Sequence, residues 1–203
     1  MIELSEKLRI DEGAYNPLGQ ADEAEDLYRS TASAVRQAST IQKLLTPEAR
    51  RVFSGIYGHF LASASAAPSR IVLVCSASTG DGTTTVAAGL AIAAAEKRTS
   101  QVLLIDGNCH SPGATDAFGA SGSKGLSDLL SGSIGTNFSF SKTMISNLTL
   151  MGAGLAPSNH IQALEPPKFR LLLDKLGGIY EFILVDGPAI NAYPESLLYA
   201  SQV

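Results

Sequence analysis

From Arg70 onward, short apolar runs alternate with longer stretches of helical spacing. Four runs predict strands, at residues 71–75, 101–105, 147–151 and 180–185. The first, second and last of these runs are nearly all apolar, as is typical of strands buried on both faces. Helices are predicted at residues 84–97, 126–131, 167–176 and 194–202. This alternation predicts an α/β fold, in which a mostly parallel sheet carries helices on both faces.

The first part of the chain has a different pattern. Residues 1–20 are polar and predict an arm, and residues 21–45 predict a weakly amphipathic helix. A further helix is predicted at residues 47–62, because Thr46 is a good N-cap and a proline suits the first helical position. Its apolar stripe comprises Val52, Phe53, Ile56, Tyr57, Phe60 and Leu61. We therefore divide the chain into an N-terminal arm and helix (residues 1–45) and an α/β domain (residues 46–203), with a linker at residues 62–69.

Composition narrows the class of protein. With 203 residues, 45% of them hydrophobic and 17% charged, the chain can bury a sizeable core. A net charge of −4 argues against a nucleic-acid partner, which favours a basic surface. Cys75 and Cys109 are too few for a disulfide framework and fit a reducing compartment. Neither a signal-peptide core nor an apolar run of about 20 residues is present, so we expect a cytoplasmic protein.

Three of the predicted strands end in polar, chemically versatile segments. They are "SASTGDGTTT" (residues 76–85), "DGNCH" (residues 106–110) and "DGPA" (residues 186–189). The carboxyl ends of parallel strands meet at one edge of a sheet, where ligands bind. Each segment alone is also explained as a turn or a helix cap. Together they predict a phosphate-binding loop made by Gly80, Asp81, Gly82, Thr83, Thr84 and Thr85, with Thr84, Asp106 and Asp186 as ligands of Mg²⁺ if a nucleotide binds.

One position departs from that pattern. Phosphate-binding loops of this kind end in Gly-Lys-Ser/Thr, but Thr83 stands where the lysine belongs. No Lys or Arg lies between Arg70 and Lys97, although Lys124 in a later loop is a candidate substitute. A charge-assisted hydrogen bond contributes roughly 1.5–3 kcal/mol, so its loss predicts weak or absent ATP binding.

The order of these segments resembles the cytoplasmic domain of bacterial tyrosine kinases (BY-kinases) of the capsular and exopolysaccharide type. These are P-loop ATPases of the SIMIBI type, related to ParA and MinD. The resemblance covers roughly residues 48–203 and rests on six segments: "EARR", "SASTGDGTTTVAAGLA", "VLLIDGNCHSPG", "GLSDLLSG", "GLAPSNHIQAL" and "YEFILVDGPA". It implies ATP and Mg²⁺ as cofactors, and a further strand after Val203. It also implies recruitment to the inner face of the membrane by an embedded polysaccharide chain-length or export protein.

The chain also departs from the family's motifs. Asn108 replaces an aspartate and His110 an arginine, while Thr84, Asp106 and Asp186 remain, the two aspartates as vestigial catalytic candidates. These losses favour a pseudokinase that acts as a binding or regulatory component of polysaccharide synthesis and export. An active ATPase or protein-tyrosine kinase is the first alternative. A positioning ATPase like ParA or MinD is the second.

Other residues have two interpretations. His110 is either a cation over phosphate or an ordinary polar residue, and zinc binding by Cys75, Cys109 and His110 lacks a fourth ligand. Tyr180, Tyr193 and Tyr199 are expected to be packing residues. The resemblance places a subunit-contact helix at residues 47–62, where Glu48, Arg51 and Tyr57 are candidate partner contacts. Because Ser54 and Ile56 break the family's contact pattern, we expect a monomer or homodimer rather than a ring.

Overall fold

The computed structural model describes residues 41–62, 69–97, 101–131, 140–155 and 166–203. All of them lie in the second of two units into which the chain divides, Arg36–Val203. The predicted arm, most of the predicted helix at residues 21–45 and most of the linker lie outside the described residues. Residues 41–44 are helical, and Ile41 and Leu44 are buried.

The sheet has five strands in the order β1-β5-β2-β4-β3. β1 (Arg70–Val74), β5 (Phe182–Asp186), β2 (Val102–Asp106) and β4 (Leu148–Met151) run parallel, which confirms the predicted strands and their direction. β3 (Ser141–Lys142) pairs antiparallel with β4 at the far edge. The sequence did not predict β3, because two polar residues carry no apolar pattern.

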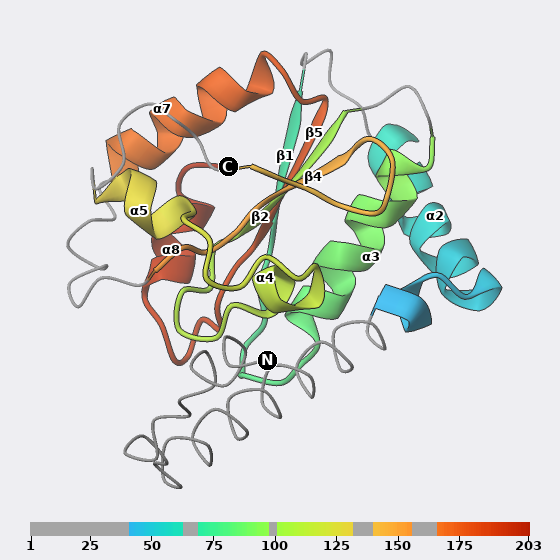
Figure 1. Cartoon of the computed structure of the whole chain (residues 1–203), viewed down its shortest axis with the longest axis horizontal. Helices are drawn as coiled ribbons and strands as arrows, with labels where there is room; N and C mark the ends of the chain where they lie inside the picture. The colour runs from blue at the N-terminus through green and yellow to red at the C-terminus, as the bar shows by residue number, and fades with distance from the viewer. Residues whose placement is uncertain (1–40, 63–68, 98–100, 132–139, 156–165) are drawn as a thin grey trace, which may run out of the picture. The chain divides into compact units, whose positions relative to one another are not determined.

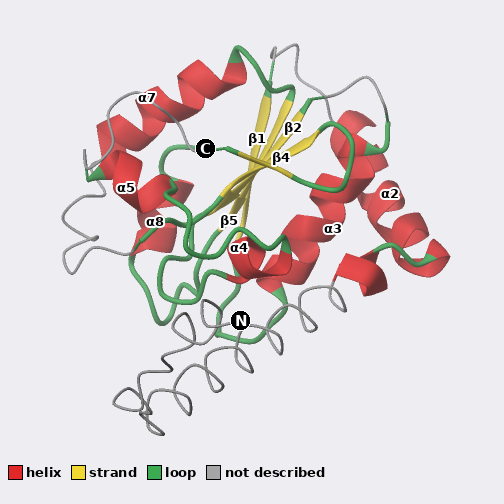
Figure 2. Cartoon of the chain, viewed as in Figure 1, coloured by secondary structure: helices red, strands yellow, loops and turns green. Residues whose placement is uncertain are grey.

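Helices cover both faces of this sheet, as predicted (Figure 1). α2 (Pro47–Ala62) and α3 (Thr83–Ala95) lie on one face, whereas α7 (Pro166–Gly177) and α8 (Glu195–Ala200) lie on the other. Two short helices, α4 (Gly113–Ala117) and α5 (Leu126–Leu130), follow the strand ends. Figure 2 shows how loops gather at the carboxyl ends of the parallel strands. No described helix combines the length and the apolar composition that a bilayer crossing needs.

α3 is apolar on all sides because it lies between the sheet and α2. All nine of its residues from Ala87 to Ala95 are buried. Gly89 allows the close approach of α2, since a methyl group there would lie 2.4 Å from a ring carbon of Phe53. A helix that is hydrophobic on all sides is usually buried on all sides. The sheet covers the inner side of α3, and α2 covers its outer side.

The apolar stripe of α2 is divided between the core and the surface. Tyr57 is only 3% exposed, and its ring packs edge-on against Phe182 with centroids 5.3 Å apart. Val52 and Ile56 are 59% and 38% exposed on the other side of the helix. The assignment of Tyr57 to partner contact is therefore corrected, because its side chain is buried in the chain's own core.

Candidate functional site

The loop between β1 and α3 has the backbone of an anion-binding turn. Gly80 and Gly82 have φ values of 95° and 89°, a left-handed conformation that glycine adopts without strain. The first hydrogen bond of α3 runs from the Val86 N–H to the Gly82 carbonyl, 3.0 Å. The N–H groups before Val86 therefore have no carbonyl partner within the helix, and they begin a helix whose dipole favours negative charge.

The side chains of this loop hydrogen bond to one another. The Thr83 hydroxyl donates to the Ser76 hydroxyl at 2.8 Å, and the Ser76 hydroxyl donates to the Ser78 carbonyl at 2.9 Å. Asp81 accepts a hydrogen bond from the Ser78 N–H at 2.9 Å, so its carboxylate also closes the loop. The Thr83 hydroxyl, at the position where the sequence analysis compares the loop with a lysine-containing motif, thus turns back onto its own loop.

A hollow of about 200 Å³ opens in front of the loop. Its lining includes loop residues from Ser76 to Thr84 together with Asn108 and Gly187 from the ends of β2 and β5. No Lys, Arg or His is among the described residues that line it. Pockets that hold a whole drug-sized molecule are larger, about 300–1,000 Å³. A hollow of this size is instead suited to a smaller group, such as a phosphate.

Asp106 is buried at the end of β2 with its hydrogen bonds satisfied. Its carboxylate accepts bonds from the Thr115 N–H and hydroxyl, both at 2.7 Å, and from the Asn108 N–H at 3.1 Å. Burial raises the pKa of Asp106 to about 6, against the opposing effect of these hydrogen bonds. The Thr115 hydroxyl also accepts a hydrogen bond from the Ala153 N–H and so joins the ends of β2 and β4. The sequence analysis did not identify Thr115 as a residue of the site.

Asp186 lies beside Asp106 on the neighbouring strand, in the same register. It is 1% exposed, and neither of its carboxylate oxygens has a partner of normal hydrogen-bond geometry in the described part of the chain. Burial, followed by the charge of Asp106, raises its pKa to about 7, while the nearby Thr84 hydroxyl lowers it somewhat. A buried carboxylate without a firm partner, next to a threonine and a second carboxylate, fits the oxygen ligand set of Mg²⁺.

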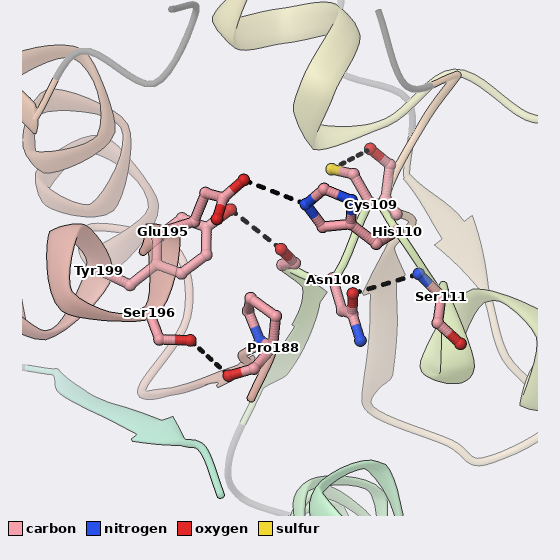
Figure 3. A network of polar contacts seen from close by, with 10 residues as sticks. Asn108, Cys109, His110, Ser111, Pro188, Glu195, Ser196 and Tyr199 are labelled. Carbon is pink, nitrogen blue, oxygen red and sulfur yellow. Dashed lines mark hydrogen bonds and ion pairs between the residues drawn. The ribbon is translucent and has the colours of Figure 1, made fainter. Parts of the chain in front are cut away.

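His110 is oriented toward α8 by two contacts. Its Nε2 atom lies 3.1 Å from a carboxylate oxygen of the buried Glu195 (Figure 3). Its ring stacks on Tyr193 with centroids 3.9 Å apart. The Asn108 side chain accepts a hydrogen bond from the Ser111 N–H at 3.1 Å. Asn108 and His110 therefore each have structural partners of their own.

α8 fixes the strand-end loops from the other side. The Tyr199 hydroxyl donates to the Gly107 carbonyl at 3.0 Å, and the Ser196 hydroxyl donates to the Pro188 carbonyl (Figure 3).

Tyr199 and Tyr180 are buried, as predicted for packing residues. Burial raises the pKa of the Cys109 thiol to about 12, which makes it a poor metal ligand. Within the described ranges, no three His, Cys, Asp or Glu side chains are grouped to hold a metal ion.

The comparisons with known proteins agree with this architecture. No family model matches the sequence. CapB of Staphylococcus aureus, described as a putative tyrosine-protein kinase, is 27% identical over 148 residues, which are 73% of this chain and 64% of CapB. Homologues of this chain are bacterial tyrosine-protein kinases. The chain spans less than two thirds of the length of CapB.

The solved structures that resemble this chain include bacterial tyrosine-kinase domains and ATPases such as MinD. The chimerical protein CapA2B2 superposes with a TM-score of 0.68 at 27% identity, over 78% of this chain and 69% of that one. The septum site-determining protein MinD of Pyrococcus horikoshii, solved with Mg-ADP, gives a TM-score of 0.51 at 29% identity, over 60% and 49% of the two chains. The fold is thus of the P-loop NTPase type that tyrosine-kinase domains and MinD share, as predicted.

Proposed function

We propose that this chain is a degenerate relative of the bacterial tyrosine kinases. It binds nucleotide weakly or not at all, and it acts as a binding or regulatory component of capsule or exopolysaccharide synthesis and export. The observation that carries this proposal is the Thr83 hydroxyl bonded to Ser76, in a hollow whose described lining has no cation. The homology to proteins of capsule systems supports a role in capsule or exopolysaccharide synthesis.

The residues present fit Mg²⁺ better than they fit a triphosphate. Thr84 and Asp186 would hold the ion, with Asp106 beside them on β2. When bound, Mg²⁺–ATP supplies the transferable phosphoryl group. The described residues that line the hollow would offer only uncharged groups to its phosphates, because Thr83 carries no charge. Phosphoryl transfer depends on neutralising phosphate charge, so the chain would orient phosphate without supporting transfer.

An active ATPase or kinase is the alternative that the unpartnered Asp186 favours, since that carboxylate fits a metal. A positioning ATPase like MinD is less well supported, because the MinD likeness is weaker and covers less of the chain. The hydroxyl at residue 83 argues against both in the same way, since each depends on tight nucleotide binding.

Calorimetric titration tests the central claim. We expect Mg²⁺–ATP to bind with a dissociation constant well above the micromolar range, or without measurable heat, because one charge-assisted contact of roughly 1.5–3 kcal/mol is missing. Lys124 is exposed and is the candidate substitute cation. Micromolar binding would contradict the proposal, and its loss in Lys124→Ala would then show that this lysine replaces the missing one.

The proposed role also needs a partner surface, which we assign to the exposed side of α2. Glu48, Arg51 and Val52 are exposed there, with Ile56 on the same side. The partner we propose is a membrane-embedded polysaccharide chain-length or export protein, which would recruit the chain to the inner face of the membrane. Tyr57 has no part in this surface, because it is buried.

We expect the double variant Arg51→Glu/Val52→Glu to reduce the fraction of chain that sediments with membranes of producing cells by about fivefold or more. Both side chains are exposed, so the melting temperature should barely change. Leu197→Glu is the matched control, since Leu197 is an exposed apolar residue of α8 on the other face of the sheet. Equal losses in variant and control would contradict the assignment of α2.

A further inference from the structure

Two hydroxyl groups at the hollow have their hydrogens turned into the protein. A carbonyl oxygen only accepts hydrogen bonds, so the Ser76 hydroxyl must donate the bond of 2.9 Å that joins it to the Ser78 carbonyl. The Thr83 hydroxyl must then donate to Ser76 at 2.8 Å, because the single hydroxyl hydrogen of Ser76 is already used. Thr83 therefore offers the hollow the lone pairs of its oxygen and no hydrogen.

The hydroxyl of Thr84, which also lines the hollow, is oriented in the same way. It lies close enough to Asp186 to lower the pKa of that carboxyl. An ionised carboxylate only accepts hydrogen bonds, so the hydrogen of Thr84 is directed at Asp186 and the lone pairs of its oxygen are left for the hollow. Thr83 and Thr84 thus both act as acceptors toward a ligand.

Asp186 lies at the wall of the hollow and is incompletely satisfied. Gly187, the next residue, lines the hollow, as does Thr84. Asp186 is 1% exposed, and neither of its carboxylate oxygens has a partner of normal hydrogen-bond geometry among the described residues. Hydrogen bonds in a chain strengthen one another, so a ligand that donates to the Thr84 oxygen also strengthens the bond from Thr84 to Asp186. The site therefore favours a ligand that brings a proton of its own.

The donors of the hollow are uncharged N–H groups. Those of Gly82, Thr83 and Thr84 have no backbone partner in the described part of the chain, and α3 begins there without a side-chain cap. Asn108 also lines the hollow. Its side-chain oxygen is occupied by the Ser111 N–H, which leaves its NH₂ group to donate (Figure 3). Such donors at the start of a helix suit the negative oxygens of a small anion.

We propose that this hollow binds free inorganic phosphate in a protonated form, without a nucleotide or a metal ion. The negative oxygens accept from the N–H groups at the start of α3 and from Asn108, while a P–OH group donates to the Thr84 oxygen. Sulfate has the same shape but carries no proton near neutral pH. It would therefore set its own lone pairs against those of Thr83 and Thr84.

The same inventory of groups disfavours larger phosphates. The hollow of about 200 Å³ suits one phosphate group, and its described lining has no Lys, Arg or His to balance the charge of a triphosphate. A single protonated phosphate carries less charge, and backbone N–H dipoles hold such anions without a cation. This inference rests on the proposed function, since it concerns the same hollow and takes tight nucleotide binding to be absent.

Calorimetric titration of the whole chain near pH 8, with EDTA present, compares the anions. At this pH Asp186 is ionised, because its pKa is raised only to about 7, and inorganic phosphate still carries one proton. We expect phosphate to bind about tenfold or more tightly than sulfate. Glycerol phosphate should bind as weakly as sulfate, since phosphate monoesters lose their last proton at about pH 6. Equal affinities for phosphate and sulfate, or no saturable binding of phosphate, would overturn the proposal.

Thr84→Val removes the accepting oxygen and keeps the shape of the side chain. It should lower the affinity for phosphate to that for sulfate and leave the affinity for sulfate unchanged. Thr85→Val is the matched control, because Thr85 is exposed in the same helical turn and does not line the hollow as described. If both variants lose phosphate affinity equally, or if neither does, Thr84 is not the acceptor and the proposal is wrong.

Asp186→Asn should change the preference in a way that misfolding cannot imitate. The new amide can donate to the Thr84 oxygen, which frees the Thr84 hydrogen to turn toward the hollow. We expect sulfate to bind more tightly than it binds the wild-type chain, and the preference for phosphate to fall to about twofold or less. An unchanged or lower affinity for sulfate would show that Asp186 does not orient Thr84, contrary to the proposal.

Titration of ATP in the same buffer, with and without Mg²⁺, separates this inference from the proposed function. Micromolar binding of ATP contradicts the proposed function and removes the premise of the inference. Weak or absent ATP binding, together with equal affinities for phosphate and sulfate, contradicts the inference alone. Weak ATP binding with a preference for phosphate that is lost in Thr84→Val supports both.

Discussion

Thr83→Lys is expected to raise the affinity for Mg²⁺–ATP by roughly ten- to a hundred-fold, which is the worth of one charge-assisted hydrogen bond. The rest of the loop needs no change, because Gly80 and Gly82 already hold the left-handed turns and α3 already begins at residue 83. The substitution removes the bond from Thr83 to Ser76, a modest loss beside the gain. Calorimetry of the two proteins in the same buffer measures the change.

The same substitution should give little ATP hydrolysis. Asn108 has no carboxylate to offer and its side chain is held by the Ser111 N–H, while His110 is held by Glu195 and Tyr193. Losing a preorganised charged donor or base lowers turnover by about 10²–10³, and one lysine does not replace a second group. Thr85→Lys is the matched control, since it adds the same charge at an exposed position of the first turn of α3.

Two outcomes would contradict this account. Rapid phosphate release by Thr83→Lys alone would show that Asn108 and His110 are compatible with catalysis. Equal gains in affinity from Thr83→Lys and Thr85→Lys would show that the loop does not direct residue 83 toward phosphate.

The four parallel strands and the strand-end residues of the candidate site were predictable because both depend on local sequence. A strand buried on both faces has a short apolar run as its sequence pattern. The first polar residue after that run marks the carboxyl end of the strand. Asp106 and Asp186 were located in that way, and the structure sets them side by side on β2 and β5. The parallel direction of the strands followed from the helices between them.

The features that sequence reasoning missed depend on contacts between distant residues. Glu195 meets His110 from 85 positions away, and nothing in a six-residue helix marks its acid as a partner for that ring. Thr115 lies in α4, which is too short to show a helical pattern. Tyr57 was misassigned because helical spacing identifies an apolar side without identifying what covers it.

Asp186→Asn is expected to make the chain more stable near neutral pH. Burial and the charge of Asp106 raise the pKa of Asp186 to about 7, whereas an unfolded chain holds aspartate near its ordinary value of about 3.9. The folded state therefore binds the extra proton. Stability from this group is full below about pH 4 and is lost as the pH rises through about 7. Asparagine never ionises, so it avoids that loss.

Urea denaturation at several pH values, without Mg²⁺, should show the wild-type chain losing stability between about pH 4 and pH 8. The free energy of unfolding of Asp186→Asn should equal that of the wild-type chain near pH 4. Near pH 8 it should be higher by on the order of 2 kcal/mol. This gain is smaller than the full pKa shift implies, because the buried amide also needs hydrogen-bond partners. A shallower slope should remain, since burial also raises the pKa of Asp106. Asp174→Asn is the control, because that carboxylate is half exposed.

Adding Mg²⁺ separates a metal-binding carboxylate from one that is merely buried. A cation that binds only the folded state stabilises it by mass action. Millimolar Mg²⁺ should therefore recover part of the wild-type stability lost near pH 8, where Asp186 is charged, and should leave Asp186→Asn unchanged. If both proteins respond equally, Thr84 and Asp186 do not form a metal site. If neither stability depends on pH, the carboxylate of Asp186 is solvated or paired in the folded chain, contrary to the geometry at the end of β5.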